Sequence, residues 1–224
     1  MEKNSRILYP YANVMGIFFP EGKLDEGGTC QYFTPTCIKN CCSHFPGDGE
    51  KIGFENKRKT YNYFLDNISK AIANKIIKEL NENNCNILTW FVSGDCPSFL
   101  ENKFYSIIKI IDNTGIAQTG FTRNASLWEK CKELKNGKVL LTVENIGIIN
   151  KEKVDSVGLY SIPNYKIGAI DIYRIFIDKK QSKSYGCGGA YYTYHIKDTE
   201  KEQAHLNLDC KKCYEEKIGC FLEN

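Results

Sequence analysis

The sequence predicts an α/β fold in which parallel strands form a partial (β/α) barrel, followed by a Cys-rich C-terminal tail. Short β-rich segments alternate with amphipathic helical segments over residues 13–178, and such alternation is typical of a parallel sheet with right-handed crossovers. Five or six such units are too few for a closed eight-stranded barrel and fit an open one. We expect one domain over residues 1–224, with the barrel at 13–178 and the tail, residues 185–224, packed on it.

The first part of the chain supplies two strands and a long helix. Residues 13–19 are predicted to form the first strand, and a loop rich in Cys, Gly and Pro follows over residues 20–53. Residues 57–83 are predicted to form one helix because their apolar residues recur at helical spacing. These apolar residues are Phe64, Ile68, Ala71, Ile72, Ile76 and Leu80. The second strand, residues 87–92, ends at Ser93-Gly94-Asp95.

Two capping-box patterns mark the helices that come next. A helix is expected to open at Pro97, with Ser98 and Glu101 as its capping box, and to run to about residue 111. The third strand, residues 116–121, ends in Thr122-Arg123-Asn124. The helix after it carries the second capping box, Ser126 to Glu129.

The remaining strands lead into the tail. The fourth strand, residues 139–143, ends in Glu144-Asn145, and a short helix is expected near residues 151–156. A fifth strand follows at 158–162 and a sixth at 167–177.

Polar residues gather where these strands end. In (β/α) barrels the carboxyl ends of the strands share one edge, and the site lies there. We therefore expect catalytic residues among Asp95, Arg123 and Glu144, because Arg123 can bind a carboxylate or phosphate through two hydrogen bonds. Structural alternatives are a helix cap for Asp95, a salt bridge from Arg123 to Asp95 or Glu144, and a turn at Asn145.

Composition excludes several classes of protein. The 30 basic and 27 acidic residues are interspersed and give a net charge of +3, so a nucleic-acid partner is not indicated. Residues 1–20 lack the apolar core of a signal peptide, and no apolar stretch reaches the roughly 20 residues of a membrane span. We expect a cytoplasmic protein with no membrane partner. The sequence contains no Walker loop, GxGxxG, GxSxG or HExxH motif.

The 11 cysteines therefore need an explanation other than disulfide bonds, which reducing compartments do not sustain. Cys30, Cys37 and Cys41 follow the first predicted strand closely, and Cys42 and His44 lie beside them. Thiolates are the soft ligands that iron–sulfur clusters and zinc prefer. We expect a metal centre in this loop.

A second group of cysteines occupies the tail. A CxxC pair lets one short turn supply two ligands, and two more cysteines complete a four-thiolate site. The residues of this group are Cys187, Cys210, Cys213 and Cys220. The group predicts a structural zinc or a second cluster, and His195 or His205 can replace one thiolate in a zinc site.

The other three cysteines lie within or beside predicted helices and strands. We expect Cys85, Cys96 and Cys131 to be small buried hydrophobic residues. Cys96 is also a candidate ligand, because it follows Asp95 at the edge where the site is expected.

The order of these motifs resembles a known family. The chain resembles the phage gene-product-eighty-eight proteins in four features. These are TC-x6-C-x3-C from Thr29, a strand ending in SGD, a strand ending in GFTR at Arg123 and a late Cys group. Those proteins look like trimmed relatives of the radical-SAM barrels. The likeness runs from about Thr29 to Cys220 and implies a partial (β/α) barrel with a four-iron cluster in the loop after the first strand.

The resemblance also implies a cofactor. In radical-SAM enzymes a CxxxCxxC motif holds a [4Fe-4S] cluster, whose fourth iron binds S-adenosylmethionine. Here Cys37 and Cys41 match CxxxC, the third position is His44, and Cys30 lies upstream. The resemblance places Ser93 and Gly94 in cofactor binding, with the acceptor Asp95 against the methionine amine. Asn145 is a further candidate for cofactor binding because it follows the end of the fourth predicted strand. A cluster used for electron transfer or structure is the alternative.

Two functions from different classes follow. The first is an iron–sulfur redox enzyme, a radical-SAM-like oxidoreductase or transferase, with one N-terminal and one C-terminal cluster. The second is a non-catalytic binding module whose cysteines hold zinc. A third interpretation is an exported protein with disulfide bonds, which would have to be intact under native conditions. The sequence does not specify whether the substrate is a small molecule or a macromolecule.

Overall fold

A computed structural model describes six stretches of the chain: residues 6–11, 14–33, 52–142, 160–165, 172–178 and 183–186. The chain divides into two compact units, Met1–Val139 and Leu140–Asn224. The predicted α/β class is confirmed, because the described residues form helices and a mostly parallel sheet. The predicted helix near residues 151–156 and the tail cysteines lie outside the described stretches.

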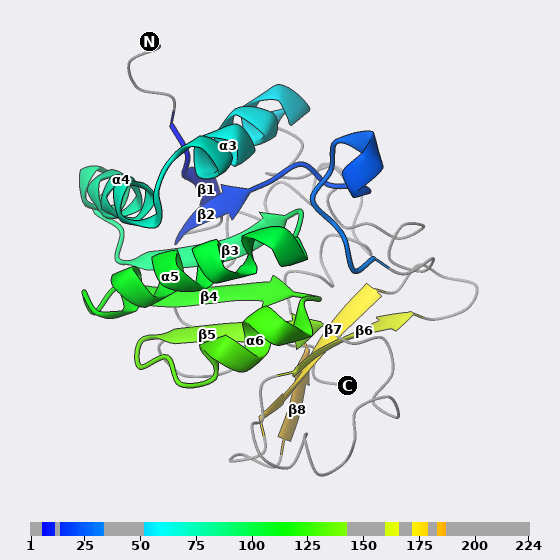
Figure 1. Cartoon of the computed structure of the whole chain (residues 1–224). Helices are drawn as coiled ribbons and strands as arrows, with labels where there is room; N and C mark the ends of the chain where they lie inside the picture. The colour runs from blue at the N-terminus through cyan, green and yellow to red at the C-terminus, as the bar shows by residue number, and fades with distance from the viewer. Residues whose placement is uncertain are drawn as a thin grey trace, which may run out of the picture. The chain divides into compact units, whose positions relative to one another are not determined.

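The first four described strands lie side by side in sequence order (Figure 1). β2 (Val14–Phe18) pairs in parallel with β3 (Ile87–Ser93), which pairs in parallel with β4 (Ala117–Thr122). These strands confirm the predictions at 13–19, 87–92 and 116–121. An edge strand that was not predicted, β1 (Tyr9–Tyr11), pairs antiparallel with β2. Its central Pro10 suits an edge, because proline donates no ladder hydrogen bond.

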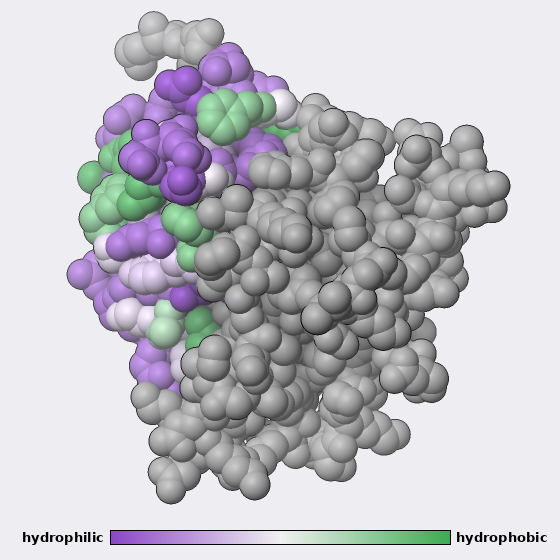
Figure 2. Space-filling view, turned by 90° about the vertical axis from the view of Figure 1, so that its right-hand side faces the viewer, coloured by the Kyte–Doolittle hydropathy of each residue, from purple (hydrophilic) through white to green (hydrophobic). Residues whose placement is uncertain are grey.

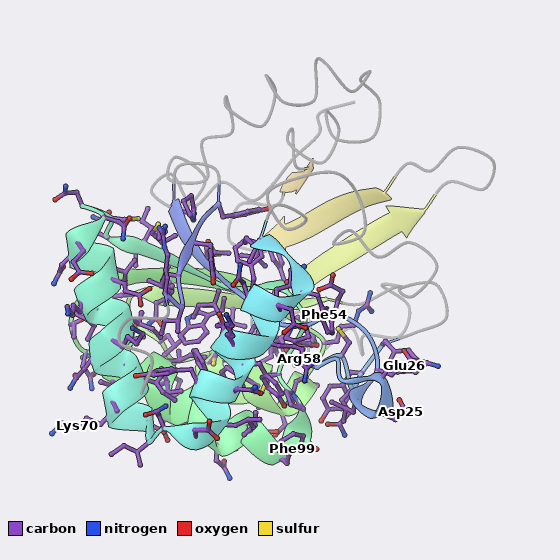
Figure 3. The ribbon with its side chains drawn as sticks, turned by 90° about the horizontal axis from the view of Figure 1, so that it is seen from above. Asp25, Glu26, Phe54, Arg58, Lys70 and Phe99 are labelled. Atoms are coloured by element: carbon purple, nitrogen blue, oxygen red, sulfur yellow. The ribbon has the colours of Figure 1, made fainter. Side chains whose placement is uncertain are left out.

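Helices cover one face of this sheet (Figures 1 and 3). α3 (Phe54–Asp66) and α4 (Ser69–Glu82) connect β2 to β3, while α5 (Glu101–Asp112) connects β3 to β4, and α6 (Ala125–Cys131) follows β4. Each connection between parallel strands therefore crosses through helix, as parallel pairing requires.

The single helix predicted for residues 57–83 is wrong, because the chain breaks between α3 and α4. Asn67 and Ile68 adopt extended backbone, with φ, ψ of −110°, 151° and −72°, 153°. The Asn67 Nδ2 atom donates to the carbonyl of Tyr63 at 2.9 Å, so it satisfies a carbonyl in the last turn of α3. The two helices pack separately on the sheet as a result.

Both predicted capping boxes are also wrong. Ser98 begins a short 3-10 helix, η3 (Ser98–Leu100), and makes no side-chain cap. α6 is capped instead by Asn124, whose Oδ1 accepts from the Leu127 amide at 3.0 Å. The Ser126 hydroxyl donates to Glu101 Oε1 at 2.8 Å, so one residue from each expected box links α5 to α6.

Aromatic side chains form the centre of the core between the sheet and the helices. The Phe19 ring meets Phe64 of α3 edge-on at a centroid distance of 5.0 Å, and Phe64 stacks on Phe104 of α5 at 5.5 Å. Trp90 joins this group, and its Nε1 donates to Gln118 Oε1 at 2.9 Å. All these residues are buried, so the cluster connects β3 and the residue that follows β2 to two helices by apolar contact.

A bulge in β3 enlarges this core. The register runs from Gly16 opposite Thr89 to Phe18 opposite Ser93, so β3 holds two more residues than β2 over the same length. Phe91 lies in this interval with φ of 52°, which is unusual for a bulky residue. The bulge brings both Phe91 and the neighbouring Trp90 against Phe104, at 5.2 and 6.2 Å.

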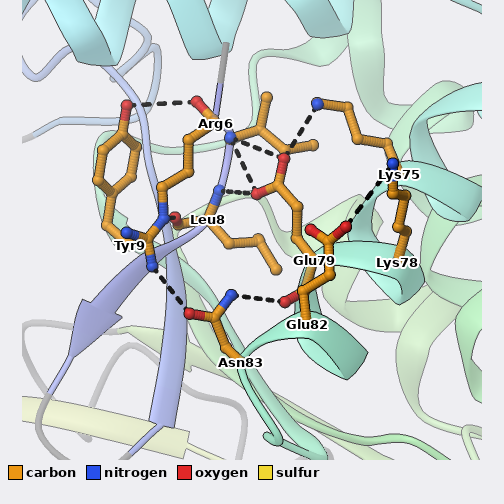
Figure 4. Close-up of polar contacts among 9 residues, drawn as sticks. Arg6, Leu8, Tyr9, Lys75, Lys78, Glu79, Glu82 and Asn83 are labelled. Atoms are coloured by element: carbon orange, nitrogen blue, oxygen red, sulfur yellow. Dashed lines mark hydrogen bonds and ion pairs between the residues drawn. The ribbon is translucent and has the colours of Figure 1, made fainter. Parts of the chain in front are cut away.

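A buried carboxylate fastens the N-terminal segment to α4 (Figure 4). Glu79 Oε2 accepts hydrogen bonds from the backbone amides of Ile7 at 3.1 Å and Leu8 at 2.8 Å, and Oε1 pairs with Lys75 at 3.0 Å. Glu79 is 7% exposed, while Ile7 and Leu8 are fully buried. The segment before β1 thus depends on one side chain for two of its backbone hydrogen bonds.

The second unit contains antiparallel strands. β6 (Tyr160–Tyr165) pairs antiparallel with β7 (Ile172–Asp178), which pairs antiparallel with β8 (Lys183–Gly186). The last residues of β5 (Gly137–Thr142) pair in parallel with β6. The expectation that all strands are parallel is therefore wrong here, because six residues between β6 and β7 are too few for a parallel crossover.

Hydrophilic and hydrophobic residues alternate on the described surface that Figure 2 shows. On the face drawn in Figure 2, hydrophilic residues cover much of the coloured surface, and hydrophobic residues occur between them in small groups. The exposed large hydrophobic residues are Leu24, Phe54, Leu65, Ile68 and Phe99. Within the described stretches, no helix combines the length and apolar character needed to cross a membrane.

Candidate metal and cofactor site

Thr29 is one of the residues that fix the loop after β2 to the end of β3. The Thr29 hydroxyl donates to the carbonyl of Pro20 at 2.9 Å and accepts from the amide of Asp95 at 3.0 Å. Thr29 is fully buried, and the amide of the next residue, Cys30, donates to the carbonyl of Gly22 at 2.9 Å. Cys30 therefore follows a residue that is hydrogen-bonded both to Pro20 in its own loop and to Asp95 after β3.

Ser93 and Gly94 form the turn that carries β3 into this region. The Ser93 hydroxyl donates to the carbonyl of Phe19 at 2.8 Å. Gly94 has φ of 72°, and a Cβ atom there would contact Thr29 Oγ1 and lie 2.8 Å from Phe19 Cβ. Only glycine fits this position without displacing the β2 loop.

Replacing Gly94 with alanine is expected to lower the free energy of unfolding by roughly 2 kcal/mol, through left-handed backbone strain and overpacking. Gly115→Ala is the matched control, since Gly115 has φ of 81° and an added Cβ would meet none of the described residues beyond its chain neighbours within 4 Å. It should cost only the backbone strain, about 1 kcal/mol. Urea unfolding of the two variants measures the difference, and equal losses would contradict the packing explanation.

Asp95 is the most connected side chain in the site. Its Oδ1 accepts from the Cys96 amide at 2.7 Å and from the Thr122 hydroxyl at 2.6 Å, while Oδ2 accepts from the Arg123 amide at 2.8 Å. Burial raises the pKa of Asp95 from 3.8 to about 6, and the hydrogen bonds from Thr122, Arg123 and Cys96 offset part of that rise. This carboxylate joins the ends of β3 and β4.

Asn124 extends the same network into α6. Besides capping that helix, it donates from Nδ2 to the carbonyl of Cys96 at 3.1 Å, and its amide donates to Thr122 Oγ1 at 3.0 Å. Sequence reasoning missed Thr29, Thr122 and Asn124 as site residues. The asparagine was detectable, because Asn directly before a helix is among the preferred N-caps.

The structure brings together some of the predicted site residues. Ser93, Gly94 and Asp95 adjoin Thr29, the neighbour of Cys30, while Arg123 meets Asp95 through its backbone amide and is itself half-buried. The other predicted site residues lie outside the described stretches. These are Cys37, Cys41, Cys42, His44, Glu144, Asn145, Cys187, Cys210, Cys213 and Cys220.

The four described cysteines differ in their surroundings. Cys96 and Cys131 are buried as expected, and burial raises the pKa of both thiols, that of Cys131 to about 12. Thiols of this kind stay protonated and bind metals poorly. Cys85, which was also expected to be buried, is half-buried at the border of the core, and Cys30 is half-buried as well. None of the four is in a disulfide bond. Within the described stretches no three Cys, His, Asp or Glu side chains form a metal-binding group.

The chemistry available at this edge is therefore one half-buried thiol on a hydrogen-bonded loop, a buried carboxylate and the backbone of a glycine turn. The chain matches no family model, no curated protein and no solved structure.

Proposed function

We propose that this protein binds an iron–sulfur cluster of the [4Fe-4S] type through Cys30, Cys37 and Cys41. The observation that carries the proposal is the placement of Cys30. It lies where the β2 loop is hydrogen-bonded to the β3 turn, at the carboxyl edge of parallel strands. Cys37 and Cys41 follow within 11 residues, close enough in sequence to converge on the same metal centre.

The proposal extends to a second metal centre in the tail. Cys187, Cys210, Cys213 and Cys220 supply the four thiolates that a cluster or a zinc ion requires. The number of cysteines in the chain supports this extension, because the first centre and the buried Cys96 and Cys131 account for only five of the 11, and these four are among the six that remain.

The cluster is proposed to serve a radical-SAM-like reaction in a partial (β/α) barrel. Two observations support the barrel: parallel strands β2, β3 and β4 with helical crossovers on one face, and polar residues at their carboxyl ends. S-adenosylmethionine is the proposed cofactor, bound against Ser93, Gly94 and Asn145. The catalytic residues are Asp95, Arg123 and Glu144, and a cytoplasmic location suits the reduced thiols.

Asp95 is proposed to accept one hydrogen bond from such a cofactor. An ionised carboxylate accepts about four hydrogen bonds, and three donors already bind Asp95. The proposed further donor is an ammonium group at Oδ2, which accepts from the Arg123 amide, while Oδ1 accepts from both Cys96 and Thr122. The surrounding hydrogen bonds keep this carboxylate in one orientation.

Metal analysis after anaerobic purification tests the proposed function. We expect a brown protein that contains iron and sulfide and absorbs broadly at about 400 nm because of thiolate-to-iron charge transfer. Cys37→Ala should lose the iron of the first centre, whereas Cys131→Ala should retain it, because Cys131 is buried among core residues. A colourless protein that contains zinc in stoichiometric amount would contradict the iron–sulfur proposal.

That contrary outcome would select a second candidate function, a non-catalytic binding module held together by zinc. The saturation of the polar groups around Asp95 favours it, since Thr29, Thr122 and Asn124 are all bonded to other parts of the protein. A chelator should then lower the melting temperature with no redox signal, because structural zinc contributes directly to folding.

A further inference from the structure

The turn between α6 and β5 contains the one Asn-Gly dipeptide of the chain, Asn136-Gly137. Glycine has no side chain to shield its backbone nitrogen or to restrict its rotation. The Gly137 nitrogen is therefore the backbone nitrogen best suited to attack a preceding asparagine side chain. Asn136 is half-buried and lies beside the start of β4 (Figure 1).

Asp112, the last residue of α5, holds Asn136 through both its backbone and its side chain. The Asn136 amide donates to Asp112 Oδ1 at 2.7 Å, and Asn136 Nδ2 donates to the Asp112 backbone carbonyl at 2.8 Å. The other carboxylate oxygen, Oδ2, accepts from the Lys135 amide at 3.1 Å. Asp112 is 1% exposed, so water has little access to compete for these hydrogen bonds.

The peptide group between Asn136 and Gly137 is held as well. Its carbonyl, that of Asn136, accepts from the amide of the fully buried Gln118 at 2.8 Å. The nitrogen of Gly137 can reach the side-chain carbon of Asn136 only when this peptide group and the Asn136 side chain both turn. The hydrogen bonds to Asp112 and Gln118 oppose these two rotations.

Packing also favours glycine at position 137. A Cβ atom there would lie 2.9 Å from Leu134 Cδ1 and 3.3 Å from Leu134 Cβ, and Leu134 packs against the core. A larger residue, which would hinder attack by the backbone nitrogen, would therefore have to displace Leu134. The reactive dipeptide and the contacts that restrain it thus belong to the same turn.

We propose that Asn136 is a deamidation site that the native fold keeps unreactive. When the turn opens, the Gly137 nitrogen bonds to Cγ of Asn136 and loses its proton, the Cγ–Nδ2 bond breaks, and ammonia leaves. Water then opens the cyclic imide and produces aspartate or isoaspartate at position 136. The reaction consumes only water and is independent of the proposed metal centres.

The product no longer fits the turn. A carboxylate at position 136 has no hydrogen to donate to the Asp112 carbonyl. It would also place a second negative charge beside the buried carboxylate of Asp112. Within the described stretches no lysine or arginine forms an ion pair with that carboxylate, so the repulsion is not offset. Each converted molecule should therefore open this turn more readily.

Peptide mass spectrometry of the full chain, incubated in mildly alkaline buffer with and without denaturing urea, tests the proposal. Asn136 should convert at least about tenfold faster in urea, because the native turn must open before the ring can close. Asp112→Ala should raise the native rate roughly fivefold or more, since it removes the acceptors of two backbone amides.

Gly94→Ala is the control for general destabilisation. Gly94 follows the last residue of β3, whereas Asn136 contacts the start of β4, so the two positions lie at opposite edges of the parallel strands. This variant should leave the native conversion rate close to that of wild type. If Asp112→Ala does not fold, Asp112→Asn takes its place, because it retains an acceptor for one of the two amides.

Asn136→Asp tests the effect of the product directly. It should unfold at a lower urea concentration than Asn136→Ala, because alanine removes the donor without adding a charge. Equal midpoints for these two variants would overturn the proposed repulsion from Asp112.

Equal conversion of Asn136 in native and urea-unfolded protein would overturn the proposal, and so would an Asn136 that stays unchanged in urea. An equal rise in Asp112→Ala and Gly94→Ala would also overturn it, because conversion would then follow unfolding of the whole unit.

Discussion

Replacing Glu79 with alanine is expected to lower the free energy of unfolding by about 4 kcal/mol, because a buried ion pair and two buried backbone hydrogen bonds are lost together. The amides of Ile7 and Leu8 would have no acceptor in a fully buried position, and the Lys75 ammonium would lose its partner. Urea unfolding followed by circular dichroism measures this loss.

Glu82→Ala is the matched control on the same helix. Its carboxylate lies 3.6 Å from Lys78 and both side chains are exposed, so its removal should cost no more than about 0.5 kcal/mol. A loss at Glu79 as small as that at Glu82 would show that the N-terminal segment does not depend on this carboxylate (Figure 4).

Stability should also fall as the pH rises from about 4 to about 6, because of Asp95. Burial raises its pKa from 3.8 to about 6, so between these values the folded protein holds a proton that the unfolded chain has released. Stability therefore decreases with pH over this window. Asp95 contributes most to the free energy of unfolding below pH 4. A pKa difference of one unit corresponds to 1.36 kcal/mol, so roughly 3 kcal/mol of this contribution is lost above pH 6.

Asp95→Asn isolates this effect, because asparagine matches the shape of aspartate and does not titrate. The difference in unfolding free energy between wild type and variant, measured at several values from pH 4 to pH 7, should shift against the wild type as pH rises. A difference that stays constant would show that the carboxylate has the same pKa in the folded and unfolded states.

The parallel strands β2, β3 and β4 could be predicted because each is a short β-rich run closed by turn residues, whereas the three-residue edge strand β1 could not. The break between α3 and α4 could not, because Ile68 continues the helical spacing from Phe64 to Ile72. In the structure Ile68 is 72% exposed and lies in the extended turn. Sequence periodicity shows only that Ile68 is apolar at a helical spacing. Its exposure to solvent depends on how the helices pack.

The candidate site could likewise be predicted only in part. Asp95 and Arg123 end neighbouring parallel strands, so their proximity follows from the order of strands and helices. The contact itself runs through the backbone amide of Arg123, and the hydroxyls of Thr29 and Thr122 complete the network. Hydroxyl groups in loops have no sequence period, so such contacts depend on tertiary geometry that local patterns do not specify.

The bulge in β3 was equally hidden from the sequence. Its two additional residues turn Phe91 toward the helices, although strict alternation would place Phe91 on the face opposite Trp90. Alternation fails at this point because φ is positive at Phe91.

The placement of the two tryptophans has a practical outcome for spectroscopy. Trp90, anchored by Gln118, and Trp128, covered by the Lys132 ammonium at 4.4 Å from its ring, are the chain's entire complement of indoles. Both belong to Met1–Val139. Intrinsic tryptophan fluorescence therefore reports on that unit, and both of its emitters lie outside the strands of Leu140–Asn224.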